Sequence, residues 1–309
     1  MYLKHILFCG LTAVMLCSFA QLQTTIITPE ALGKILFFDP ILSGNKTISC
    51  ASCHNPNLAF ADSVAFSIGV NGFSKRNTPS VMNMSQRTAL FWDGRAATLE
   101  NQSWFPIQDS TEMNLSKKEA VFRLRASTNY TQLFKQVYNT LPTAKNIAQA
   151  LAAYERTLES TGSPFDAYMR GNATAVSDAA IRGHKLFVGK AKCFDCHFGP
   201  DFTIDDFKNI GLYNGTTLTD KGRYNITKNK KDIGKFKVPG LRNVSLTGPY
   251  MHNGMFANLR AVVNYYNNPT QIVHSAIGTD DILAQPLNLS NQECEDLVAF
   301  MNTLTDIKK

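Results

Sequence analysis

Two copies of the pattern C-x-x-C-H constrain this chain more than any other feature. The residues that form them are Cys50, Cys53, His54, Cys193, Cys196 and His197. The pattern is the attachment signature of c-type haem, in which two thiols add to the porphyrin vinyl groups and the adjacent histidine supplies the proximal iron ligand. A redox pair of thiols or a four-cysteine zinc site is the alternative, but either leaves both histidines unexplained. The sequence therefore predicts two covalently bound c-type haems.

The start of the chain predicts export. Residues 1–20 combine Lys4 with an apolar stretch and end on small residues at Ser18 and Ala20. This is typical of a cleaved secretory signal peptide; the alternative, a membrane anchor, needs about 20 apolar residues. No later segment is apolar enough to span a bilayer, so we expect a periplasmic protein without stable membrane insertion.

Length and composition fit two packed domains. The chain has 309 residues, of which 44% are hydrophobic and 18% charged, so a core can form and wholesale disorder is excluded. A formal net charge of +7 is too moderate to indicate a nucleic-acid partner, and we expect none. After residues 1–20, the predicted domains are 21–165 and 166–309, each with one haem motif.

Helix signals outnumber strand signals, so the expected fold class is mainly α. Proline opens a helix over 29–38, and further helices are expected after the capping residues Ser116, Thr143, Ser163, Ser177 and Ser290. Segments 39–91 and 198–250 lack periodicity and are rich in turn residues. Loops of that length are uncommon in compact domains unless they wrap something.

The sixth iron ligand decides whether a haem transfers electrons or reacts with oxygen species. No histidine lies between His54 and His184, so the first haem is expected to keep an open or weakly held distal site. The methionines that could close it are Met82, Met84 and Met113. The candidates for the second haem are Met251, His252, Met255, Tyr265, Tyr266 and His274.

Four segments, 36–44, 48–54, 91–96 and 237–254, resemble the bacterial di-haem cytochrome c peroxidases, a superfamily that includes the MauG-type enzymes. The resemblance implies two cytochrome c-like domains with a calcium ion between them. It implies reduction of hydrogen peroxide to water at the N-terminal haem. Electrons would come from a small donor protein, such as a cytochrome c or a cupredoxin, through the C-terminal haem. Family members are commonly dimers, which suggests a homodimer.

The resemblance also implies roles for individual residues. Glu112 matches the distal acid, Gln102 its polar neighbour, and Trp92 the tryptophan between the haems. His54 and His197 match the proximal ligands. The residues that match the calcium ligands are Asn77, through its side chain, and Thr247 and Pro249, through their carbonyl groups.

Two positions depart from the peroxidase pattern. Many family members carry a histidine near Val70-Asn71 that blocks the first haem until the second is reduced, and it is absent here. Fourteen residues after His252, the peroxidases have a methionine ligand to the second haem, whereas this chain has Tyr266, the residue type found in MauG-type enzymes. A phenolate would favour ferric iron and lower the potential; the alternative is that Tyr266 only packs in the core.

Three functions remain open from the sequence. The first is a peroxidase that uses a small redox protein as donor. The second is a MauG-like enzyme that oxidises residues of a protein substrate, and the third is a non-enzymatic di-haem electron carrier. Cys294 has no partner once both haems are attached, and we expect a buried thiol there.

Overall fold

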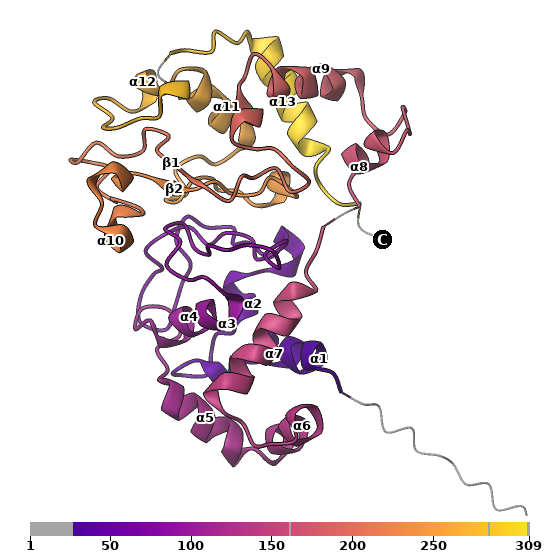
Figure 1. Ribbon diagram of the computed structural model, residues 1–309, viewed down its shortest axis with the longest axis vertical. Coiled ribbons are helices and arrows are strands. Elements are labelled where there is room, and N and C mark those ends of the chain that lie inside the picture. The colour runs from indigo at the N-terminus through magenta and orange to yellow at the C-terminus, as the bar shows by residue number, and fades with distance from the viewer. Residues whose placement is uncertain (1–26, 161, 284, 308–309) are drawn as a thin grey trace, which may run out of the picture.

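The structure is a computed structural model that describes residues 27–307 except 161 and 284. It is mainly helical, as predicted, and its two halves lie one above the other along the long axis of the molecule (Figure 1). Each half has its own hydrophobic core. The signal peptide predicted for residues 1–20 lies outside the described residues, and the boundary predicted after residue 165 stays a prediction.

The N-terminal half is built on two long helices that cross closely. Helix α1 (Pro29–Phe38) packs along α7 (Ala144–Arg156) at Gly33, where a Cβ atom would lie 1.9 Å from the Ala150 carbonyl oxygen. Only glycine allows this approach. The remaining helices of this half are η1 (Pro40–Leu42), α2 (Cys50–Cys53), η2 (Pro56–Leu58), α3 (Leu99–Gln102), α4 (Trp104–Gln108), α5 (Lys117–Ala126) and α6 (Thr128–Tyr138).

The C-terminal half repeats this arrangement. Helix α9 (Asp178–Val188) packs on α13 (Asn291–Asn302) at Gly183, where a Cβ atom would lie 1.8 Å from the Asp296 carbonyl oxygen. A short antiparallel pair, β1 (Phe207–Lys208) and β2 (Phe236–Lys237), faces the other half. The other helices are α8 (Pro164–Met169), η3 (Cys193–Asp195), α10 (Tyr224–Thr227), η4 (Lys230–Asp232), η5 (Val244–Leu246), α11 (Leu259–Asn267), α12 (Pro269–Ile272) and η6 (Asp281–Leu283).

The helix starts predicted from capping residues are confirmed. Thr143, Ser163 and Ser290 each form a reciprocal capping box with the residue three positions later, which satisfies two backbone N–H groups at the helix start. At Ser116 the side chain accepts from the Glu119 N–H, and at Ser177 from the Ala180 N–H. The two predicted aperiodic segments hold only short elements.

Ion pairs and backbone bonds tie the two halves together. Arg76 bridges them, because its Nε lies 2.6 Å from Asp220 Oδ2 and its Nη1 lies 2.7 Å from Asp93 Oδ2. The Lys237 N–H donates to the Trp92 carbonyl oxygen at 2.8 Å. The side chains of Arg76, Asp93 and Asp220 are all at least partly buried. Removing one partner of a buried ion pair destabilises the fold, because it leaves an uncompensated charge.

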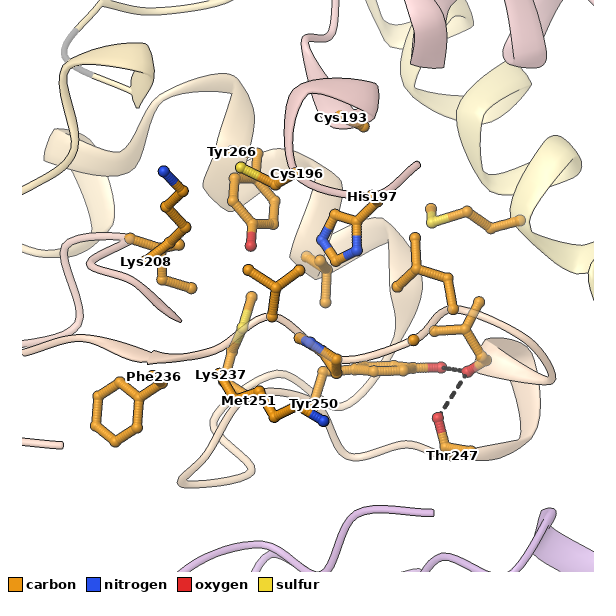
Figure 2. Close-up of a pocket in the computed structure, with 18 of the residues that line it drawn as sticks. Cys193, Cys196, His197, Lys208, Phe236, Lys237, Thr247, Tyr250, Met251 and Tyr266 are labelled. Atoms are coloured by element: carbon orange, nitrogen blue, oxygen red, sulfur yellow. Dashed lines mark hydrogen bonds between the residues drawn. The ribbon is translucent and has the colours of Figure 1, made fainter. Parts of the chain in front are cut away.

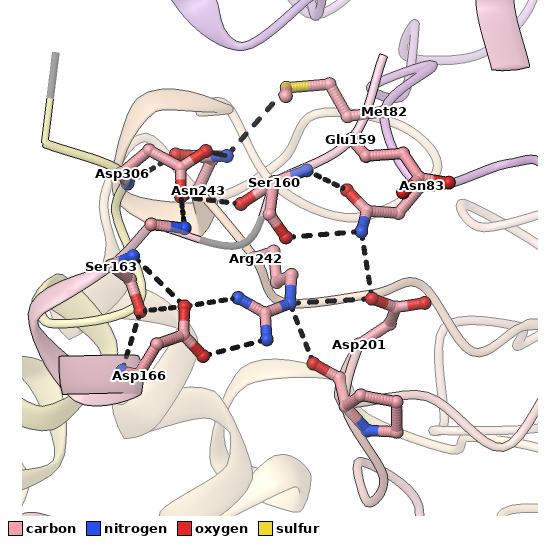
Figure 3. Close-up of polar contacts among 12 residues, drawn as sticks. Met82, Asn83, Glu159, Ser160, Ser163, Asp166, Asp201, Arg242, Asn243 and Asp306 are labelled. Atoms are coloured by element: carbon pink, nitrogen blue, oxygen red, sulfur yellow. Dashed lines mark hydrogen bonds and ion pairs between the residues drawn. The ribbon is translucent and has the colours of Figure 1, made fainter. Parts of the chain in front are cut away.

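A second polar cluster holds the segment between the halves (Figure 3). The Ser160 N–H donates to Asn83 Oδ1 at 3.1 Å, and the Ser160 hydroxyl donates to Asp306 Oδ1 at 2.8 Å. The Asp306 N–H in turn donates to Asn243 Oδ1 at 2.8 Å. The connecting segment and the end of the chain are therefore fixed to each other and to both halves. No helix within the described residues is long and apolar enough to cross a bilayer.

Candidate haem sites

A large cavity opens beside the second C-x-x-C-H motif, with a volume of about 270 Å³. Cys193, Cys196 and His197 line it, and Tyr266 and Met251 extend toward the same space (Figure 2). The short helix η3 turns the histidine into the cavity, and the His197 N–H donates to the Cys193 carbonyl oxygen at 2.8 Å. The cavity continues to the junction with the N-terminal half, where Trp92 lines it.

The first motif lines a separate and smaller cavity. We call it the first cavity, and we call the larger one beside the second motif the second cavity. Cys50 and Cys53 begin and end α2, and His54 follows directly at the end of that helix. The His54 imidazole Nδ1 lies 3.0 Å from the Phe60 carbonyl oxygen, and His197 Nδ1 lies 2.9 Å from that of Phe202. An Nδ1–H that donates to a carbonyl leaves Nε2 as the nitrogen that can bind a metal, which is how proteins orient metal-ligating histidines.

The surroundings of both motifs fit a c-type haem. Burial lowers the pKa of His54 and of His197, which favours the neutral imidazole that coordinates iron. Burial also raises the pKa of Cys50 and of Cys193 to about 12, so neither is a reactive thiolate. Among the described residues, no group of three or more cysteine, histidine or acidic side chains comes together as a zinc site would require.

Glu112 and Gln102 line the cavity of the first motif together, although they come from different segments. Burial is the main cause that raises the pKa of Glu112, and the nearby Asp109 adds to it, while Arg95 and Lys75 oppose it. The carboxyl group can therefore exchange a proton nearer to neutral pH than an exposed glutamate.

The loop over 66–74 fixes the position of Glu112. The Val70 N–H donates to the Glu112 carbonyl oxygen at 2.7 Å, and a Cβ atom on Gly69 would lie 2.7 Å from the Glu112 Cα. The Asn71 side chain donates to the Ser110 carbonyl oxygen at 3.1 Å. The segment around Val70-Asn71, which departs from the peroxidase pattern, is thus bonded to the loop that carries Glu112.

The structure separates the candidate distal ligands. Met113 lines the first cavity, whereas Met82 and Met84 line the second. Tyr265 is fully buried, and its hydroxyl donates to the Ile210 carbonyl oxygen, so it is a core residue. Around the second motif, the candidates that line the cavity are Met251, His252 and Tyr266, whereas Met255 and His274 are exposed and lie outside it.

One backbone pattern recurs in both halves. An antiparallel bridge joins Leu90 to Ala96, and the same bridge recurs 160 residues later between Tyr250 and Phe256. Capping residues that begin α3 and α11, Thr98 and Asn258, have the same offset of 160. With this offset, Pro106 corresponds to Tyr266, and each lines its own cavity. Proline has no side-chain donor for a metal, whereas tyrosine has one.

Trp92 and Asn77 lie where the two halves meet. The Trp92 Nε1–H donates to the Asn77 carbonyl oxygen at 2.8 Å, and the Asn77 N–H donates to the His252 carbonyl oxygen at 2.7 Å. Asn77, Thr247 and Pro249 all line the second cavity near this junction. Their role as calcium ligands stays a prediction.

Sequence reasoning missed one residue of the first cavity. Glu155 lines it and is 6% exposed, and its Oε2 has no hydrogen-bond partner among the described residues. The available signal was its spacing, because Glu155 lies one helical turn after Leu151, which lines the same cavity.

Comparisons with known proteins identify relatives over most of the chain. A family profile described as di-haem cytochrome c peroxidase matches residues 28–174. The chain is 40% identical to the methylamine utilization protein MauG of Methylorubrum extorquens, over 90% of this chain and 79% of that protein. It is 36% identical to the cytochrome c peroxidase Ccp of Escherichia coli, over 90% of this chain and 58% of that protein.

Solved structures give the same result. A MauG-like protein associated with microbial copper homeostasis superposes with a TM-score of 0.81 at 34% identity, covering 90% of this chain and 89% of that one. The diheme peroxidase BthA from Burkholderia thailandensis gives 0.79 at 25% identity, covering 90% and 86%. Fold and matches define a haem-dependent oxidoreductase. The chain belongs to the di-haem cytochrome c peroxidase family, and the prediction of a cytochrome c peroxidase-like oxidoreductase is confirmed.

Proposed function

We propose that this protein reduces hydrogen peroxide to water at its N-terminal haem, with electrons that a small redox protein delivers through its C-terminal haem. The haems would be held by Cys50, Cys53 and His54 in one cytochrome c-like domain and by Cys193, Cys196 and His197 in the other. Each would supply an iron that exchanges electrons, and the first would also bind peroxide.

One observation supports this proposal most: Glu112 and Gln102 face the same cavity as His54. Peroxide must lose a proton from the oxygen that is bound and gain one on the oxygen that leaves as water. A buried carboxyl group can perform both transfers as a general base and then a general acid. The Gln102 amide can orient the peroxide by hydrogen bonding without changing its own charge.

Electron delivery through the C-terminal half rests on exposure and on position. Phe194, inside the second motif, and Phe198, directly after it, are 41% and 46% exposed, so the attachment edge lies near the surface. Trp92 reaches the inner end of the same cavity and bonds to both halves. The direct test is turnover of hydrogen peroxide with a reduced small cytochrome c or cupredoxin as the donor. A protein with both haems that consumes no peroxide with any such donor would contradict the proposal.

We expect the fully oxidised protein to react with peroxide without prior reduction. The blocking histidine of other family members is absent, and Asn71 is bonded to the Ser110 carbonyl oxygen in its place. Rapid mixing of all-ferric protein with peroxide, followed by absorbance, should give the same rate as the half-reduced protein. Asn71→His provides the matched variant, which should slow the reaction of the oxidised form. A requirement for reduction in the unaltered protein would contradict the expectation.

A MauG-like oxidation of a protein substrate is the second candidate. It is favoured by Tyr266, which faces the cavity of His197 and matches the residue type of the MauG-type enzymes. Burial raises the pKa of Tyr266, so its phenol would ionise only next to a cation such as iron. Failure of small donors together with oxidation of one dedicated protein would favour this function.

Replacing Tyr266 distinguishes the candidate ligands of the second haem. If the phenolate binds iron, Tyr266→Phe should raise the reduction potential of that haem and change its low-spin paramagnetic resonance g-values, because a hard anionic donor stabilises ferric iron. Met251→Leu removes a second candidate from the same cavity and should change neither property. The opposite pattern would identify Met251 as the ligand.

We further propose a periplasmic location, one calcium ion between the halves, and a homodimer. Asn77, Thr247 and Pro249 supply only amide and carbonyl oxygens, so waters would have to complete the usual six to eight oxygen ligands of calcium. These proposals rest on the family resemblance and on the position of the three residues.

A further inference from the structure

The cavity of the first motif contains a second acid besides Glu112. Glu155 is on α7, one turn after Leu151, and both residues face the cavity. The carboxyl group is nearly inaccessible, and its Oε2 has no hydrogen-bond partner among the residues that the structure describes. An unpartnered buried carboxyl group is expensive unless it is neutral or compensates another charge. Packing alone therefore does not explain why a carboxyl group is buried at this position.

The two acids of this cavity influence different attachment cysteines. Glu155 acts electrostatically on Cys50, and Glu112 acts on Cys53. Cys50, Cys53, Glu112 and Glu155 all line this cavity, so a haem held there would share it with two carboxyl groups. Glu112 already has a role in moving the peroxide protons, whereas Glu155 has none.

Burial is the dominant influence on Glu155. It raises the pKa of this carboxyl group to about 8, a nearby Glu100 adds to the effect, and Arg156 opposes it. Arg156 and Glu100 pair with each other at 2.8 Å, so their charges largely cancel at this site. Tyr154, which is next in the chain, is neutral, because burial raises its pKa further. Helices α1 and α5 also pack against α7, but their charged residues are not among the causes of this pKa shift. These residues are Glu30, Lys34, Lys117, Lys118, Glu119, Arg123 and Arg125.

We propose that Glu155 couples proton uptake to reduction of the N-terminal haem: when the iron gains one electron, the Glu155 carboxylate gains one proton from solvent. The ferric centre carries one more positive charge than the ferrous centre, so it favours the carboxylate, whereas the ferrous centre favours the neutral acid. The electron comes from the donor protein, and the proton keeps the total charge of the buried site constant. This inference rests on the haem attachment in the proposed function but not on peroxide chemistry.

The test is the reduction potential of each haem as a function of pH, measured by spectroelectrochemistry on the protein with both haems. On the acidic side of about pH 8, the potential of the N-terminal haem should fall by up to about 59 mV per pH unit, which is a tenfold change in the reduction equilibrium. In Glu155→Gln this slope should disappear, and the potential should stay at its acidic value. The C-terminal haem of the same molecules is the internal control, and its slope should not change.

Two further variants separate the outcomes. Glu112→Gln should keep the slope, which shows that it does not arise from the catalytic acid. Glu155→Leu should abolish it like the glutamine variant, which covers the case in which one replacement fails to fold. Reduction in a weakly buffered indicator solution should show one proton fewer taken up by either Glu155 variant. A slope that persists in both Glu155 variants, or an unaltered protein without a slope, would overturn the inference.

Peroxide turnover is not needed for any of these measurements. A protein that shows the slope but consumes no peroxide would disprove the proposed function and leave the proton coupling intact. A protein that consumes peroxide but shows no slope would disprove the proton coupling and leave the proposed function intact.

Discussion

Replacing Glu112 with glutamine is expected to lower the rate of peroxide reduction by about 10²- to 10⁴-fold, the usual contribution of a positioned general acid–base group. Glutamine has nearly the same shape as glutamate but cannot take a proton from peroxide and return it. Steady-state turnover with a reduced cytochrome c as donor measures the effect. Because binding of peroxide to iron does not need the carboxylate charge, the loss should appear mainly in kcat.

The pH dependence gives a second reading of the same variant. Burial and Asp109 raise the pKa of Glu112, so its base form is lost as the pH falls through that raised value. Activity of the unaltered protein should therefore decline toward acid, and this decline should be absent in Glu112→Gln. Glu30→Gln, which replaces a partly exposed carboxyl group at the start of α1, is the matched control and should keep both the rate and the decline. Unchanged turnover in Glu112→Gln would remove Glu112 from the mechanism.

The second large effect concerns the two pairs of attachment cysteines. Removing Cys50 and Cys53 together should leave one haem per chain and no measurable peroxide reduction, because the site that contains Glu112 would lose its iron. Removing Cys193 and Cys196 should also leave one haem, but the oxidised protein should still react with peroxide. The variant without Cys193 and Cys196 should lose peroxide turnover only in assays in which a donor protein supplies the electrons.

Haem content after denaturation and rapid peroxide mixing measure these two outcomes separately. Cys294→Ala is the matched control, because this cysteine is buried in α13 and belongs to neither motif. It should keep both haems and full turnover. Loss of peroxide reaction in the Cys193 and Cys196 variant, with retention in the Cys50 and Cys53 variant, would reverse the proposed roles of the halves.

Local rules predicted the starts of six helices, α1, α5, α7, α8, α9 and α13, and missed the others. Ser and Thr caps act within four residues, so Thr143, Ser163 and Ser290 could be recognised from sequence. Helix α6 was missed, although its aromatic residues Tyr130, Phe134 and Tyr138 recur every four positions. Leu133 and Val137 lie beside them, so the apolar spacing was a usable helix signal.

The site was harder to predict because its walls come from distant segments. The haem motifs are local, so the sequence alone is enough to predict roles for Cys50 and His54. That Glu112 and Gln102 face one cavity, however, depends on how α3, α4 and the 66–74 loop pack, which no short pattern records. Glu155 was hidden for a different reason, since a glutamate in an amphipathic helix is usually exposed, and only its tertiary surroundings make it buried.

The matching bridges and helix starts at an offset of 160 residues, together with Gly33 and Gly183 at equivalent helix crossings, are what an ancient gene duplication leaves behind. A single one-haem ancestor would have needed one wall residue to serve both electron transfer and oxidant binding. Two copies remove that conflict, because Pro106 and Tyr266 can evolve separately on the same scaffold. Under the proposed function, selection could then retune the copy that accepts electrons without altering the copy that meets the oxidant.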